Sequence, residues 1–527
     1  MTSLELAIAL AAAAVALDLL ARHLATPRPV VLAAGGLVLG LFWARIPDLP
    51  GFALPPNLVL GLVLPPLLAA AAFRVPLGAF RASLRPITLL AVGLVLVTMA
   101  GVAAVAHSVI PGLPWAAAFV LGAAVSPPDP VAATAVAGRV GLGNRLVTIL
   151  AGEGLVNDAG ALVAYQVAVA AVVTGEFSWG HTAVEMVRSA PVGILVGLGV
   201  GLVTAAVRRR VNDTMVETAV SLLVPYVAYV VADRVHGSSV LAVVALGFFL
   251  RRRATELGSP ATRLVNRVVW QAVDFLMAGV VFVLVGIELG RVASQVSPGI
   301  LLHALAVVAA TIIIRLLWMY SVPYATRLVT ASDRPSPPSS ELTVLGWSGM
   351  RGVVTLALAL AIPLTTATGA PFPARNELVA IGLAVVLVTL LGQGLTLAPL
   401  IRWLGIADPD AAAREEREAR AAAEVAGRER IERLAAEGAI TADQRARLID
   451  VLALEVGKPG GRGRLAAGLA SDKESRSLLL ALADARRAIL RRWDDGDLND
   501  DSAARLEAEL DLSEVSLRGT AGEIVGN

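Results

Sequence analysis

The 527-residue chain contains no cysteine, only five histidines, and few charged residues: 16%, against roughly a quarter in an ordinary soluble domain. Without cysteine there is no disulfide, thiolate metal site or cysteine nucleophile, and the scattered histidines form no metal-ligand cluster. Apolar residues make up 56% of the chain and come in runs of about 20, the length with which a helix crosses a hydrocarbon layer of about 30 Å. The composition predicts an all-α polytopic membrane protein that is not an enzyme and needs no cofactor.

Charge divides the chain into two parts. Residues 1–407 contain 25 Arg and 17 Asp and Glu, a net charge of +8, whereas residues 408–527 contain 19 Lys and Arg and 25 Asp and Glu, a net charge of −6. We therefore expect a transmembrane domain at 1–407 and a polar helical domain at 408–527. Helical stretches are expected at about 410–436, 441–456, 474–492 and 502–511. The arginines flank apolar runs, which indicates membrane topology rather than nucleic-acid binding.

The apolar runs predict thirteen transmembrane spans. They lie at about 3–21, 29–46, 52–73, 86–110, 115–137, 146–174, 189–207, 214–233, 238–250, 268–288, 299–323, 341–363 and 377–404. Loops on one side carry seventeen arginines and loops on the other carry five, so the positive-inside rule places the N-terminus outside and the acidic tail in the cytoplasm. Glu5 and Asp18 favour a first span over a signal peptide at the N-terminus.

Two predicted spans are interrupted at their centres. The fifth contains Ser126-Pro127-Pro128-Asp129-Pro130, and the twelfth contains Gly346-Trp347-Ser348-Gly349-Met350-Arg351-Gly352. Thirteen spans divide into six, a linker and six, which places the two breaks in matching positions of an inverted repeat. Paired broken helices mark a binding site near the membrane midplane.

Buried carboxylates are the strongest candidates for that site, because an ionised acid inside a bilayer costs at least a few kcal/mol. Asp129 lies between two prolines, where a carboxylate and freed carbonyls suit a hard cation; a helix cap is the alternative role. Glu153 and Asn157 share one helix face in the sixth span, and Asp158 turns away by about 100°. Small residues at Gly152, Gly154 and Gly160 allow close helix approach, which brings Asp129 within reach of Asp158.

A buried arginine requires a counter-charge, and we expect Arg351 to form a structural ion pair with Glu153, leaving Asp158 free to bind a proton or a cation. Arg315 is expected to snorkel towards the cytoplasmic surface. Asp18 and Glu217 are expected at span ends and His303 as a packed, hydrogen-bonded residue. For Asp274 there are two alternative roles: it lines an access funnel, or it takes part in helix packing.

At these residues the chain resembles the cation/proton antiporter family, in particular bacterial sodium/proton antiporters related to the animal sodium/proton exchangers. The resemblance covers about residues 1–405. It rests on residues 126–133, Gly152-Glu153 with Asn157-Asp158, Leu64-Pro65-Pro66-Leu67-Leu68, and the sequence from Gly346 to Val354.

The resemblance implies thirteen helices in inverted repeats, with spans 4–6 and 11–13 moving against a dimer-forming scaffold of spans 1–3 and 8–10. It also implies that Asp158 is alternately protonated and cation-bound, with Asp129 at the helix crossing and Glu153 paired to Arg351. The chain departs from the family pattern at three places. Many members have Thr where it has Pro128 and Ser where it has Gly154, and some have an acid where it has Ala69–Ala72.

These observations predict a homodimeric secondary antiporter of a bacterial inner membrane, contributing to pH homeostasis. It would exchange cytoplasmic Na⁺ or Li⁺ for external H⁺ in an electroneutral cycle, because a single titrating Asp158 stands beside a neutral Asn157. Asp158, Asp129, Glu153 and Asn157 would bind or transport the ions. A K⁺/H⁺ antiporter is the alternative. A cation channel would need a continuous polar stripe, and a membrane-embedded hydrolase would need a nucleophile with its base.

Overall fold

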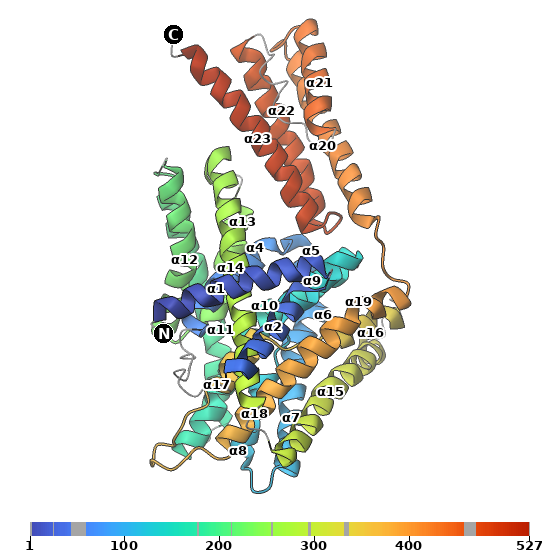
Figure 1. Ribbon diagram of the computed structural model, residues 1–527. Coiled ribbons are helices and arrows are strands. Elements are labelled where there is room, and N and C mark those ends of the chain that lie inside the picture. Colours follow the sequence, from blue (N-terminus) through green and yellow to red (C-terminus); the bar gives the residue numbers. More distant parts are fainter. Residues whose placement is uncertain are drawn as a thin grey trace.

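The computed structural model describes residues 3–24, 26–43, 59–175, 179–211, 213–254, 257–293, 297–330, 337–457 and 471–525. Within these ranges the chain is helical, and its β-type pairing is one isolated bridge between Thr365 and Pro371. Figure 1 shows a large body of helices from residues 1–407 with a separate helical bundle at one end. The predicted all-α architecture is confirmed.

The N-terminal half of the body follows the predicted order of apolar segments. Its helices are α1 (Ser3–His23), α2 (Arg28–Trp43), η1 (Val59–Val63), α4 (Leu64–Arg74), α5 (Leu77–Ala82), α6 (Leu84–Thr88), η2 (Leu89–Leu94), α7 (Val95–Val109), α8 (Trp115–Val125), α9 (Pro130–Val140) and α10 (Asn144–Thr174). In the described residues, α4, α6 and α7 adjoin short π-helical turns, so each of these apolar segments is longer than its α-helical part.

The second half of the body contains α11 (Trp179–Arg208), α12 (Thr214–Arg234), α13 (Ser239–Arg252), α14 (Pro260–Ala293), α15 (Pro298–Thr330), α16 (Ser339–Trp347), α17 (Val353–Leu360), α18 (Arg375–Leu387), η3 (Val388–Gln393) and α19 (Gly394–Trp403). By length and composition, eight helical segments among the described residues can cross a membrane, and two shorter apolar helices join them. The full number of thirteen spans stays a prediction.

Glycines set the closest helix packing in the body. Gly36 and Gly40 of α2, four residues apart, lie against the backbone of α14, and Gly286 and Gly290 of α14 lie against the backbone of α2. Small residues at this spacing allow two membrane helices to pack with their backbones in near contact. A side chain at any of these four positions would push α2 and α14 apart.

The tail forms its own bundle of four helices, α20 (Ala411–Ala436), α21 (Ala442–Val456), α22 (Asp472–Asp494) and α23 (Asp500–Val525). Its apolar core includes Ile431, Leu452, Leu482 and Leu510, all almost fully buried. The helical stretches predicted after residue 408 are present, and the last one is longer than expected. Most of the glycine-rich segment at 457–463, between the second and third of these helices, lies outside the described residues.

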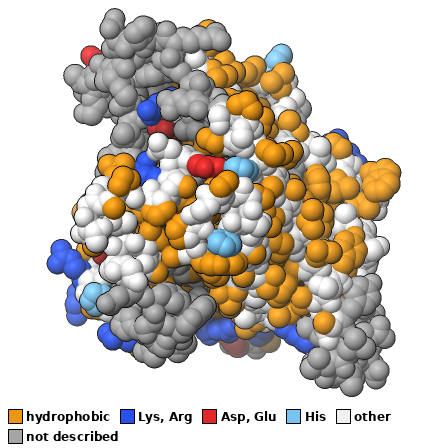
Figure 2. All heavy atoms as spheres, turned by 90° about the horizontal axis from the view of Figure 1, so that it is seen from below, with side chains coloured by type: hydrophobic (Ala, Val, Ile, Leu, Met, Phe, Trp, Pro, Cys, Tyr) orange, Lys and Arg blue, Asp and Glu red, His pale blue; other side chains and the backbone are white. Residues whose placement is uncertain are grey.

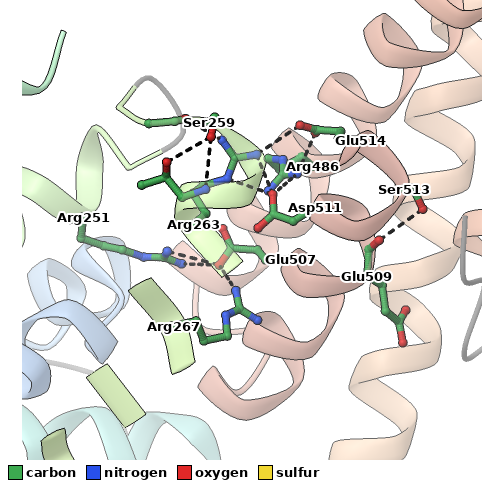
Figure 3. A network of polar contacts seen from close by, with 12 residues as sticks. Arg251, Ser259, Arg263, Arg267, Arg486, Glu507, Glu509, Asp511, Ser513 and Glu514 are labelled. Carbon is green, nitrogen blue, oxygen red and sulfur yellow. Dashed lines mark hydrogen bonds and ion pairs between the residues drawn. The ribbon is translucent and has the colours of Figure 1, made fainter. Parts of the chain in front are cut away.

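Ion pairs attach this bundle to the body (Figure 3). Glu507 of α23 contacts Arg251 of α13 at 3.2 Å and Arg267 of α14 at 3.9 Å, and Arg263 of α14 contacts Asp511 at 2.6 Å and Glu514 at 3.1 Å. The acidic tail therefore binds the basic membrane part through oppositely charged side chains.

Candidate ion-binding site

The first helix break separates α8 from α9, and residues 126–129 lie between these two helices. Pro130 has no N–H to donate, and a proline disfavours helical geometry in the residue before it. Asp129 is extended and caps α9: its carboxylate accepts a hydrogen bond from the Val131 N–H at 2.8 Å. The break predicted in the fifth span is confirmed, and the capping contact considered for Asp129 is present.

The second break, at residues 348–352 between α16 and α17, touches the first. The Asp129 N–H donates to the carbonyl oxygen of Met350 at 2.7 Å. The Asp129 carboxylate lies directly against Gly352, where a Cβ atom would take its place. The two interruptions therefore form one crossing, and Gly352 is the residue that lets the carboxylate approach the start of α17.

Arg351 also lies at this crossing, and its side chain is buried, with 1% of it exposed. Its guanidinium donates to the carbonyl oxygens of Val125 at 2.8 Å, Ser126 at 3.3 Å and Gly349. These carbonyls end α8 and follow α16, so a cation sits where the helix dipoles are negative. Asp129, an anion, sits where α9 and α17 begin. The crossing is thus held by charges matched to the ends of four half-helices.

The expected ion pair between Glu153 and Arg351 is wrong. Glu153 instead forms a two-pronged ion pair with Arg315 of α15, with distances of 2.5 and 2.9 Å, and Arg315 is 1% exposed, so its predicted snorkelling is wrong as well. Arg315 also donates to the carbonyl oxygen of Leu345 at 3.0 and 3.1 Å. Arg351 has carbonyl acceptors of its own at the break, whereas Arg315 lies in an apolar helix and needs a carboxylate.

Asn157 and Asp158 point to different neighbours, as their 100° separation on α10 predicts. The Asn157 amide donates to the carbonyl oxygen of Pro128 at 3.3 Å and so ties α10 to the first break. Asp158 borders a cavity of about 60 Å³ together with Asp129. Among the described residues, no ion pair or hydrogen bond reaches the Asp158 carboxylate. The cavity has room for a few waters, at roughly 10–15 Å³ each.

The walls of this cavity come from two groups of helices. The breaks, α10 and α17 supply its polar residues, whereas α4 supplies Leu64, Leu67 and Leu68, and α14 supplies Ala278 and Phe282. Gly154 of α10 packs against the ring of Pro130, where a Cβ atom would overlap it. Small residues on α10 therefore bring Asp158 and Asp129 to one cavity, as expected from the glycines in the sequence.

The departures from the family pattern border the same cavity. Pro128, Gly154 and Ala71 all line it and none supplies a side-chain oxygen. Thr355 of α17 also lines it, and sequence reasoning did not select this residue. The sequence feature that could have indicated Thr355 is its position four residues after Arg351, in the first turn of the helix that restarts after the break.

Other ionisable residues in the membrane part have partners away from the cavity. Asp18 pairs with Arg22 and Arg28, Glu217 with Arg208, Asp274 with Arg74, and His303 with Glu377. The hydrogen-bonded role expected of His303 is therefore present. Within the described ranges, no group of three or more His, Cys, Asp or Glu residues could hold a metal ion. Asp158 and Asp129 differ from the other acids because they face one internal space.

Two broken helices that cross inside a membrane body, with buried carboxylates beside the crossing, define the class of secondary ion transporters. The family model described as sodium/hydrogen exchanger, transmembrane, matches residues 7–403. The chain belongs to this sodium/hydrogen exchanger family.

Relatives agree with this assignment. The chain is 32% identical over 530 residues to an uncharacterized Na⁺/H⁺ exchanger of Mycobacterium tuberculosis, covering 97% of this chain and 95% of that protein. It is 32% identical to a sodium, potassium, lithium and rubidium/H⁺ antiporter of Bacillus pumilus, over 69% of this chain and 56% of that protein. The protein is thus a multi-pass membrane antiporter with bacterial relatives.

A solved structure shows the same fold. The sodium proton antiporter MjNhaP1 of Methanocaldococcus jannaschii superposes with a TM-score of 0.60, covering 78% of this chain and all of that chain at 19% identity.

Proposed function

We propose that the protein exchanges one cytoplasmic Na⁺ or Li⁺ for one external H⁺, with Asp158 as the carboxylate that carries either ion. The observation that carries this proposal is the placement of Asp158 and Asp129 on one buried cavity, with Asp158 lacking a cationic partner among the described residues. A buried carboxylate without a counter-charge is stable when it binds either a proton or a cation.

The proposed one-for-one stoichiometry follows from the charges around Asp158. Glu153 is neutralised by Arg315, and Asn157 is neutral, so the moving unit has the same charge whether Asp158 holds a proton or a monovalent cation. In this proposal Asp129, whose carboxylate accepts a hydrogen bond from the Val131 N–H, has the same charge in both loadings. No net charge then crosses the membrane per cycle.

The proposed orientation has the N-terminus outside and the tail in the cytoplasm. Figure 2 shows the end of the body away from the tail, where hydrophobic side chains are the most numerous of the coloured ones. Arg251, Arg263 and Arg267 lie on the tail side. This distribution supports the positive-inside assignment. We infer that residues 408–527 form a cytoplasmic domain and that the protein works as a homodimer in a bacterial plasma membrane.

For the identity of the transported cation, one alternative to Na⁺ and Li⁺ has an observation in its favour. The relative from Bacillus pumilus is named for potassium and rubidium in addition to sodium and lithium. A K⁺/H⁺ exchange is therefore the second candidate. A channel is disfavoured because the described cavity is small, about 60 Å³, and its polar residues face apolar walls from α4 and α14.

The test is proton flux in everted vesicles, with Na⁺, Li⁺ and K⁺ added separately after a pH gradient is formed. Cation-dependent dissipation of the gradient is expected for wild type and none for Asp158→Asn, while Asp129→Asn is strongly impaired. Asp18→Asn is the matched control, because Asp18 is a buried carboxylate paired with arginines outside the cavity. Wild-type flux in folded Asp158→Asn protein would refute the assignment.

Stoichiometry is tested in proteoliposomes with a potassium diffusion potential set by valinomycin and with no gradient of pH or Na⁺. Membrane potential is worth about 2.3 kcal/mol per charge per 100 mV, so an electrogenic exchanger would accumulate Na⁺. No potential-driven uptake is expected here. Accumulation would contradict one-for-one exchange.

A further inference from the structure

Thr355 is a buried hydroxyl with no hydrogen-bond partner among the described residues. Its side chain is 0% exposed, lies in the first turn of α17, and lines the cavity that contains Asp129 and Asp158. A threonine in a helix usually donates its hydroxyl to the carbonyl four residues earlier. That residue is Arg351, which belongs to the break before α17, so the hydroxyl has no such helical acceptor.

We propose that the Thr355 hydroxyl oxygen is a ligand of the transported cation. This inference rests on the proposed function, because the cation is the one exchanged at Asp158. A hard monovalent cation prefers oxygen ligands, and the cavity offers the carboxylates of Asp158 and Asp129 together with this hydroxyl. When Asp158 is protonated instead, the hydroxyl can accept its proton in a hydrogen bond, so Thr355 is satisfied in both loadings.

The position of Thr355 also explains how the chain manages without side-chain oxygens at Pro128 and Gly154. Gly154 packs against the Pro130 ring, so adding a side chain there requires displacing α9. A hydroxyl on α17 reaches the cavity from the opposite broken helix and avoids this contact. Thr355 therefore supplies a neutral oxygen that α9 and α10 do not.

The test compares Thr355→Val, which removes the hydroxyl at nearly constant volume, with Thr355→Ser, which keeps it. Thr98→Val is the matched control, because Thr98 of α7 is also 0% exposed with an unpartnered hydroxyl but does not line the cavity. Each variant is purified and assayed in proteoliposomes for proton flux against Na⁺ and Li⁺ concentration, and its Na⁺ binding is measured by titration calorimetry.

We expect Thr355→Val to raise the KM and Kd for Na⁺ about tenfold, as suits the loss of one hydrogen-bonding ligand to a charge. Its maximal rate should change little, and Thr355→Ser and Thr98→Val should resemble wild type. Equal KM and Kd in Thr355→Val and Thr98→Val would overturn the inference. If Thr355→Val folds poorly, Thr355→Ser decides: a folded Thr355→Ser variant that has lost Na⁺ affinity would also overturn the inference. Absence of cation-dependent proton flux in wild type would instead overturn the proposed function, and this inference with it.

The tail carries a second, independent inference, because it contacts both walls of the cavity-forming body. On one side, α23 holds α13 and α14 through Glu507 and through Arg263 (Figure 3). On the other, Glu415 of α20 accepts from the Asn144 amide at 3.0 Å at the start of α10. The bundle thus bridges α14, which forms the apolar wall, and α10, which bears Asp158.

We infer that the docked tail is a latch that slows exchange. A site between two groups of helices reaches each side of the membrane in turn only if one group moves against the other. A bundle bonded to both must strain or release one set of contacts during that movement. Arg251 also lies over the Trp493 ring at 4.3 Å, so the attachment combines ion pairs with a cation–π contact.

The test combines Glu507→Gln with Arg263→Gln in the full-length chain, which removes the four ion pairs that the described residues form between α23 and the body. Glu432→Gln is the control, since Glu432 pairs with Arg445 inside the tail. We expect the exchange rate to rise about threefold or more in the double variant, with an unchanged KM for Na⁺. An unchanged or lower rate in folded protein would overturn the latch.

Discussion

The pairing of Glu153 with Arg315 gives the sharpest quantitative prediction. Both side chains are about 1% exposed, and their two hydrogen bonds join α10 to α15. Removing one member leaves a buried charge, which costs about 3–5 kcal/mol, whereas removing both with well-packed neutral residues is nearly neutral. Glu153→Gln and Arg315→Met should each destabilise strongly, and the double variant should recover most of the loss.

This loss of stability can be measured as a decrease in the thermal unfolding midpoint of the purified protein. An unfolding entropy of about 2.1 cal/mol/K per residue over a body of ~400 residues converts 3–5 kcal/mol to a drop of about 4–6 °C. The double-mutant cycle should show a coupling energy well above the ~0.5 kcal/mol typical of independent sites. The corresponding cycle of Glu153→Gln with Arg351→Met should show the weaker coupling, because Arg351 binds carbonyls of the breaks.

Two outcomes would refute this reasoning. Additive effects of Glu153→Gln and Arg315→Met would mean that the pair does not act as a unit. A coupling of Glu153 to Arg351 that exceeds its coupling to Arg315 would restore the pairing that the sequence suggested. Exchange by the double variant provides a further check, since a structural ion pair predicts retained cation-dependent flux once stability is restored.

Three further predictions concern the crossing and the tail. Gly352→Ala should abolish exchange in a folded protein, because the added methyl group would occupy the place of the Asp129 carboxylate; wild-type flux would contradict the crossing geometry. Truncation after Ala407 should leave exchange measurable in vesicles and change its regulation, and a folded but inactive truncation would show that the tail is essential. Burial raises the pKa of Asp500 to about 6, against the opposing attraction of Arg251 and Arg74 and with the aid of Asp501 and Glu507. Since the docked pKa lies above the ordinary value for an aspartate, protonation favours docking below about pH 6 and this gain is lost as pH rises through 6. Exchange should therefore slow as cytoplasmic pH falls through this range, and Asp500→Asn should remove that component; an unchanged profile would contradict it.

The local features of the fold were accessible from the sequence because they depend on short-range chemistry. Pro128 and Pro130 flank Asp129 and both lack the N–H that a helix needs, and glycines at 346, 349 and 352 weaken a helix by their backbone freedom. Both breaks lie where they were predicted. The separation of Asn157 from Asp158 on the helix face likewise follows from helical periodicity alone, and the two side chains face different neighbours.

The ion-pair and hydrogen-bond partners of these residues could not be predicted from the sequence in the same way. Glu153 had two candidate arginines, and choosing between them requires knowing that the carbonyls of Val125 and Ser126 already surround Arg351. Those acceptors exist only because α8 ends beside the second break. Thr355 illustrates the same limit, since its unpartnered hydroxyl becomes informative only when α17 is placed against α10 and α9.

The sequence by itself determined the class of protein, the two breaks, the candidate carboxyl groups at 129 and 158, and the opposite charges of the body and the tail. These follow from composition, proline and glycine chemistry and helical periodicity, which act over a few residues. Only the tertiary structure decided that Arg315 neutralises Glu153, that Asp129 lies against Gly352, that Thr355 lines the same cavity as both aspartates, and that α23 binds α14. The physical reason is that electrostatic and hydrogen-bond partners are selected by three-dimensional distance, and residues 162 positions apart, such as Glu153 and Arg315, have no local signal to mark their contact.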